Sequence, residues 1–84
     1  MIKDMTVKQI LNYFPCVGIG FTDFAAVIGI PVANLYSITS GKSSGKKYRD
    51  LIVVTLVNDY SKEYKLMMTL HREMQRIEGE TTND

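Results

Sequence analysis

The chain has 84 residues, 45% of them hydrophobic, and a formal net charge of +1. This length suits a single domain, and the hydrophobic content excludes disorder as the main state of the chain. The single cysteine, Cys16, excludes an internal disulfide, and a single histidine, His71, leaves too few ligands for a zinc site of the usual four-ligand kind. We expect Cys16 to be a small buried side chain and His71 a partly exposed helix residue.

No catalytic set of serine, histidine and aspartate, no pair of carboxylates in an apolar setting and no cofactor fingerprint is present in the sequence. The segment MIKDMTVKQ has no apolar signal-peptide core, and the apolar run over residues 51–57 is far too short to span a bilayer. We therefore expect a cytoplasmic protein that is not an enzyme, needs no cofactor or metal, takes no small-molecule substrate and has no membrane partner.

The first predicted helix begins after Thr6. Thr6 and Gln9 have the spacing of a capping box, in which each side chain bonds the other residue's backbone N–H. The helix then covers residues 7–14, and Pro15 ends it because proline cannot continue a helix.

The second and third helices are separated by a short turn. Residues 21–28 form the second helix, and Gly29 ends it in a left-handed conformation. Ile30 follows as a buried plug, and Pro31 suits the first turn of a third helix that continues to about Ser40. The inward-facing side chains of the two helices are Phe24, Ala25, Ile28, Leu35 and Ile38.

The segment DLIVVTLV is rich in β-branched residues, which favours a strand. Its apolar residues nevertheless match a helical stripe, and a lone strand has no partner elsewhere in the chain. We therefore predict a helix, whose buried stripe is Tyr48, Leu51, Ile52, Thr55 and Leu56.

Ser61 caps a last helix over residues 62–78, which ends at Gly79. The domain thus spans residues 1–78, and residues 79–84 form a polar, disordered tail. The stripe Tyr64, Met67, Leu70, Met74 and Ile77 has two interpretations. It either closes the core, or forms a homodimer interface made of Met67, Leu70, Met74 and Ile77, and both can hold.

The stretch GFTDFAAVIGIPVANLYSITSGK, residues 20–42, resembles the helix-turn-helix of the lambda-repressor and Cro-like group, also called the XRE family. The family has a small residue where its two helices cross, a glycine in the turn, an apolar plug, two apolar residues on the second helix and a Gly-Lys pair after it. The matching residues here are Ala25, Gly29, Ile30, Leu35, Ile38, Gly41 and Lys42.

The resemblance implies a compact all-α domain, which we expect to contain five helices including the helix-turn-helix. It also implies a phage-type transcriptional regulator that binds double-stranded DNA as a homodimer, with the third helix in the major groove. The base-reading candidates are Val32, Ala33, Asn34, Tyr36, Ser37 and Ser40, and Asn34 is the strongest because an amide can pair with adenine through two hydrogen bonds.

Four of the ten basic residues lie within the eight positions 42–49, directly after the third helix: Lys42, Lys46, Lys47 and Arg49. We expect them to contact phosphates, since neutralising phosphates supplies most of the non-specific affinity for DNA. The alternative is a protein-interaction module of the same fold, such as an antirepressor or inhibitor, that does not bind DNA. The mild side chains on the outer face of the third helix favour that alternative.

Overall fold

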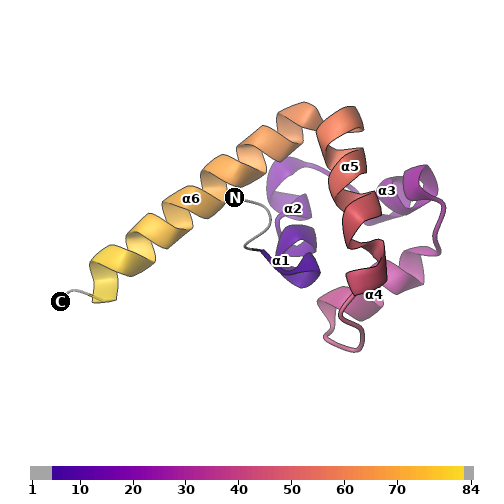
Figure 1. Ribbon diagram of the computed structural model, residues 1–84, viewed down its shortest axis with the longest axis horizontal. Helices are drawn as coiled ribbons and strands as arrows, with labels where there is room; N and C mark the ends of the chain where they lie inside the picture. The colour runs from indigo at the N-terminus through magenta and orange to yellow at the C-terminus, as the bar shows by residue number, and fades with distance from the viewer. Residues whose placement is uncertain (1–4, 83–84) are drawn as a thin grey trace.

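The computed structural model describes residues 5–82 and the side chains of residues 5–78, and it has no strand in that range. The described residues form six α-helices and one 3-10 turn (Figure 1), which confirms the all-α class but not the expected five helices. In chain order they are α1 (Val7–Asn12), α2 (Phe14–Val17), α3 (Phe21–Ile28), α4 (Val32–Thr39), the 3-10 turn η2 (Lys46–Tyr48), α5 (Arg49–Asp59) and α6 (Ser61–Thr82).

The extra helix comes from Pro15. The capping box forms as predicted, with the Thr6 hydroxyl accepting from the Gln9 N–H at 3.1 Å and the Gln9 amide oxygen accepting from the Thr6 N–H at 2.8 Å. The first helix, however, stops at Asn12, and Pro15 lies in the first turn of α2. A proline has no N–H to lose at that position, so it starts a new helix here instead of opening a loop.

The core is built by all six α-helices. The fully buried rings of Phe14 and Phe24 pack edge to face within it, with centroids 4.8 Å apart. The last helix contributes Met67, which is fully buried. The other core residues are Met5, Val7, Ile10, Leu11, Ile19, Ala25, Ile28, Leu35, Ile38, Ile52 and Leu56.

The β-branched segment is helical, as predicted, and forms α5. Ile52, Thr55 and Leu56 of the expected stripe are buried, whereas Leu51 is 43% exposed and does not belong to it. A helix satisfies its backbone hydrogen bonds locally, which an unpaired strand cannot do.

The last helix is longer than predicted. It continues through Gly79 to Thr82, so the expected end at Gly79 is wrong, and positions 83 and 84 of the expected tail lie outside the described residues. Glycine weakens a helix interior by about 1 kcal/mol but ends the helix only where it adopts a left-handed conformation.

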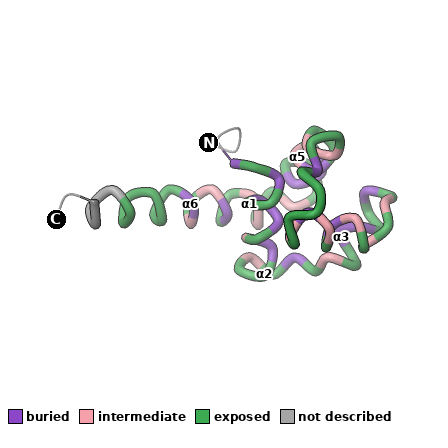
Figure 2. The backbone as a smooth tube through the Cα atoms, turned by 90° about the horizontal axis from the view of Figure 1, so that it is seen from below, coloured by how far each residue is buried: buried purple, intermediate pink, exposed green. Residues whose placement is uncertain are grey.

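The second half of α6 extends away from the other helices (Figure 2), and no residue between Arg72 and Glu78 is buried. The radius of gyration is accordingly 13.3 Å, above the roughly 12 Å expected for a compact chain of this length.

Two expectations about burial are reversed. Cys16 is exposed, because Phe14 and Val17 take the inward face of the short helix α2. His71 is buried, one helical turn after Met67 on the same face of α6. Its ring packs edge to face on Tyr13, and its Nδ1 lies 3.1 Å from the Tyr13 hydroxyl. Partial burial of Tyr13 itself raises the pKa of its phenol, and the nearby Cys16 and Glu78 raise that pKa further.

No single helix among the described residues has both the length and the apolar composition to span a membrane. The helices α3 and α4 pass that test only when taken together as a bent pair.

Candidate nucleic-acid interface

The helices α3 and α4 meet at a steep angle around Gly29. Three residues separate the helices, and the chain bends by 120° between them. Gly29 has φ 75° and donates its N–H to the Ala25 carbonyl, which also accepts from the Ile30 N–H. Ala25 is 2% exposed and belongs to the core, so a larger side chain at this position would displace its neighbours. Ile30, the expected buried plug, is only partly buried, although it packs against the core.

The outer face of α4 is a stripe of four residues at helical spacing. Ala33 and Ser40 are exposed, Ser37 is half-buried, and Tyr36 is 55% exposed. The Tyr36 ring packs against Phe21 at the start of α3, with centroids 5.2 Å apart. The candidate Val32 differs from these four, because it packs against the core and offers little surface for a base contact.

Asn34, the strongest base-reading candidate, has a partner within the chain. Its side-chain amide donates to the hydroxyl of Tyr48 at 3.0 Å, and both residues are half-buried. Asn34 is therefore not simply a solvent-facing residue. The amide carries two N–H groups and an oxygen, so one N–H and the oxygen remain for a ligand while Tyr48 limits how the amide turns.

Tyr48 is the residue of the candidate site that the sequence alone does not identify. Its helical spacing assigned it to the buried stripe of the next helix, and no sequence signal links it to Asn34. A half-buried tyrosine nonetheless needs a partner for its hydroxyl, and α4 supplies that partner.

A polar hollow of about 240 Å³ lies beside this pair. The loop after α4 is tied back to the helix, because the Ser37 carbonyl accepts from the N–H groups of Lys42 at 2.9 Å and Ser43 at 3.2 Å. The Lys47 ammonium lies 5.0 Å from the centre of the Tyr48 ring, a cation–π arrangement. The residues that line the hollow are Asn34, Ser37, Lys42, Ser43, Lys47 and Tyr48.

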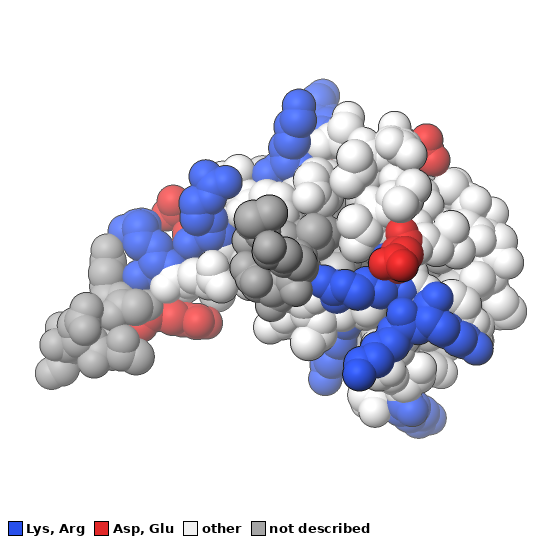
Figure 3. Space-filling model, viewed as in Figure 1, with Lys and Arg blue, Asp and Glu red and all other residues white. Residues whose placement is uncertain are grey.

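The four basic residues line two different cavities. Basic side chains gather near α4 and the loop that follows it (Figure 3), but Lys42 and Lys47 line the hollow, whereas Lys46 and Arg49 line a different cavity beside Met5. Arg49 also donates from its guanidinium to the Met5 carbonyl at 2.6 Å, which ties the start of α5 to the segment before α1. Of the expected phosphate contacts, the structure therefore brings only Lys42 and Lys47 together with Asn34.

The candidate dimer residues are also divided. Met67 is completely buried in the core of a single chain, so it is not available to a partner. Leu70 is half-buried, whereas Met74 is 50% and Ile77 49% exposed. Leu66, which is 46% exposed and precedes Leu70 by one helical turn, extends this outer face of α6.

A second apolar surface was not foreseen. Leu51, Val54 and Val57 on α5 are between 43% and 55% exposed. Apolar residues occupy all sides of this helix, more than one buried face requires. This distribution is the sequence feature that indicates an exposed apolar surface.

The described residues contain no group of three or more histidine, cysteine or acidic side chains that could hold a metal ion. Comparisons with protein-family models, with characterised proteins and with solved structures find no match for this chain.

Proposed function

We propose that this chain is a DNA-binding domain of the helix-turn-helix kind and acts as a transcriptional regulator of the phage-repressor or Cro type. The observation that supports the proposal is that an exposed helix face and a polar, basic hollow lie side by side. The exposed stripe of α4 lies beside a hollow that contains Asn34 and two lysines. The steep crossing of α3 and α4 over Ala25 and Gly29 supports the assignment, because helix-turn-helix pairs cross at about 90–120° through a short turn.

In this proposal α4 enters the major groove. Its eight residues give a helix about 12 Å long, and the major groove of B-DNA is wide enough to admit such a helix. Ala33, Tyr36, Ser37 and Ser40 face the bases or the groove wall, and Asn34 reads a base with the amide groups that Tyr48 leaves available. Lys42 and Lys47 neutralise phosphates at the edge of the groove. The protein binds operator-like DNA as a homodimer in the cytoplasm.

The first test is the salt dependence of binding. We expect fluorescence anisotropy on duplex DNA of mixed sequence to show binding that weakens as salt rises. Replacing Lys42 and Lys47 with Ala should lower the slope of log affinity against log salt by about 1.8 per subunit, about 0.9 for each lost phosphate contact. The matched control replaces Lys62 and Lys65, two exposed lysines on α6, and should leave the slope unchanged.

The second test separates base contacts from phosphate contacts. Asn34→Ala should weaken binding to the preferred site by about 1–3 kcal/mol and leave random duplexes and the salt slope nearly unaffected. Tyr48→Phe removes only the hydroxyl that holds Asn34, so it should reduce the same preference by a smaller amount. Equal losses on preferred and random DNA would show that Asn34 does not read a base.

A second candidate function is a protein-interaction module of the same fold. The exposed apolar side chains on α5, Leu51, Val54 and Val57, favour it, because such surfaces commonly contact other proteins. If the wild-type chain binds no duplex at low salt, the DNA-binding proposal is wrong and this function replaces it.

A further inference from the structure

The hollow beside α4 has a lining suited to a small anion. Each of the six residues that line it carries a side-chain hydrogen-bond donor, and none of these six is an aspartate or glutamate. Its volume of about 240 Å³ is below the roughly 300–1,000 Å³ of pockets that hold drug-sized molecules. The hollow is therefore matched to a single charged group rather than to an extended ligand.

Two hydroxyls of the hollow are positioned to donate to a ligand. The Tyr48 hydroxyl accepts from the Asn34 amide at 3.0 Å, and the Ser43 hydroxyl accepts from the Gly45 N–H at 3.2 Å. A hydroxyl that accepts a hydrogen bond still has its own proton to donate. Both hydroxyls are thus held in place by the chain and keep a donor for an anion.

The hollow also contains two positive charges that the protein does not neutralise. Lys42 is held there by its backbone, since its N–H donates to the Ser37 carbonyl at 2.9 Å, and the Lys47 ammonium lies 5.0 Å from the centre of the Tyr48 ring. Within the part of the chain that the structure describes, neither lysine forms a salt bridge. Two ammonium groups without a carboxylate attract an anion of charge near −2 more strongly than one of charge −1.

We propose that this hollow is a binding site for one phosphomonoester group, held by Lys42 and Lys47 and by the hydroxyls of Ser43 and Tyr48. A phosphomonoester carries a charge of about −1.5 to −2 at pH 7 and three acceptor oxygens, which match two ammonium groups and the hydroxyl donors. A backbone phosphate of DNA is a diester with a single charge and compensates the two lysines only in part. A small phosphorylated molecule that occupies the hollow takes the place of a DNA phosphate and weakens DNA binding, a consequence that rests on the proposed function.

Titration with methyl phosphate, followed by two-dimensional amide NMR of the ¹⁵N-labelled chain without DNA, tests this site. We expect saturable shifts at millimolar concentration, concentrated in residues 34–37 and 42–48, with the ionic strength held constant by sodium chloride. Dimethyl phosphate, the diester, should bind at least about threefold more weakly. Absent or unsaturable shifts would overturn the proposal. Equal or tighter binding of dimethyl phosphate would also overturn it, and would assign the hollow to the DNA backbone alone.

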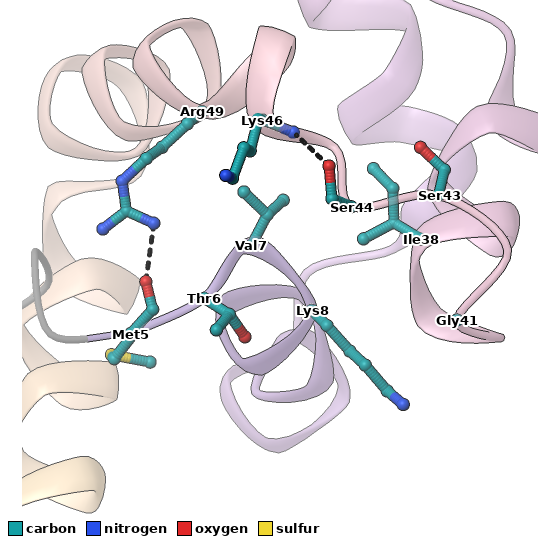
Figure 4. Close-up of a pocket in the computed structure, with 10 residues that line it drawn as sticks. All are labelled: Met5, Thr6, Val7, Lys8, Ile38, Gly41, Ser43, Ser44, Lys46 and Arg49. Carbon is teal, nitrogen blue, oxygen red and sulfur yellow. Dashed lines mark hydrogen bonds between the residues drawn. The ribbon is translucent and has the colours of Figure 1, made fainter.

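Two adjacent lysines provide matched variants. Lys47 lines the hollow, whereas Lys46 lines the larger cavity beside Met5 (Figure 4). Lys47→Ala should weaken methyl phosphate binding by about three- to fivefold, and Lys46→Ala, which removes the same charge, by less than about twofold. Both lysines are exposed, and the spectra report whether each variant is folded. Equal losses in the two variants would show attraction by the basic loop as a whole and refute a site in the hollow.

Competition with DNA tests the consequence for regulation. Methyl phosphate should lower the affinity of the wild-type chain for duplex DNA, measured by fluorescence anisotropy, more than sodium chloride of the same ionic strength does. Lys47→Ala should reduce this difference. Saturable shifts without competition would contradict a shared site for the two phosphates. If the wild-type chain binds no duplex, the proposed function fails, whereas the NMR titrations still decide whether the hollow binds a phosphomonoester.

Discussion

Gly45, in the loop that follows α4, lies directly against the core residues Ile38 and Val7. This contact offers a sharp test of the fold. Gly45 has φ 70°, and a Cβ built there would lie 2.6 Å from Ile38 Cδ1 and 3.1 Å from Val7 Cγ1. Gly41 in the same loop has a similar φ of 85° but nothing within 4 Å of such a Cβ. Both glycines therefore have a left-handed backbone, but only Gly41 has room for a Cβ atom.

Gly45→Ala should destabilise the domain more than Gly41→Ala. Both variants place a side chain in a left-handed conformation, at a cost of about 1–2 kcal/mol. Gly45→Ala adds overpacking against Ile38, which costs a further 1–3 kcal/mol or so. In a domain of this size, each 1 kcal/mol lowers the melting temperature by about 4–8 °C. Urea and thermal unfolding followed by circular dichroism measure the difference directly.

A double-mutant cycle isolates the contact. Ile38→Val removes Cδ1, the atom closest to the new Cβ, and alone should cost about 0.5–1.5 kcal/mol. In that background the extra cost of Gly45→Ala should shrink, giving a coupling energy between the two sites. Equal destabilisation by Gly45→Ala and Gly41→Ala would refute the reasoning, since it would mean that Ile38 moves into the adjacent cavity at no cost.

Two further predictions concern the helix crossing and the outer face of α6. Ala25→Leu should overpack the crossing of α3 and α4 and lower the free energy of unfolding by about 1–3 kcal/mol. The control Ala26→Leu, on the exposed face of α3, should change that free energy by less than about 0.5 kcal/mol. Equal melting curves for the two variants would contradict this crossing. Leu66→Lys combined with Met74→Lys should shift a homodimer toward monomer in sedimentation without loss of helicity, whereas Met67→Lys should unfold the chain because Met67 is fully buried. A wild-type chain that is monomeric at high micromolar concentration would contradict the dimer.

The sequence alone was sufficient for the helical class and for most helix positions. Capping by Thr6 and Gln9, the left-handed Gly29 and the helical spacing of residues 48–56 are local properties, which depend on residues within one or two turns. The prediction that the β-branched segment is helical is confirmed. It rested on the helical spacing and on the lack of a second strand with which this segment could pair.

The helix ends and the burial of single residues depended on packing. Pro15 is compatible both with a loop and with the first turn of a new helix, and the core position of Phe14 decides between them. Gly79 is compatible with a helix end and with a helix interior. Cys16 and His71 were assigned to the wrong environments because the inward faces of α2 and α6 follow from their neighbours in space.

The candidate site was visible in the sequence only as a set of neighbouring residues. Asn34 and Tyr48 are fourteen positions apart, and only the fold brings the amide to the hydroxyl. Lys46 and Lys47 are adjacent in the chain, yet Lys46 lines the cavity beside Met5 and Lys47 lines the hollow at α4. Residues next to each other on a helical turn point in different directions, so a run of basic residues in the sequence lines two different cavities in the folded chain.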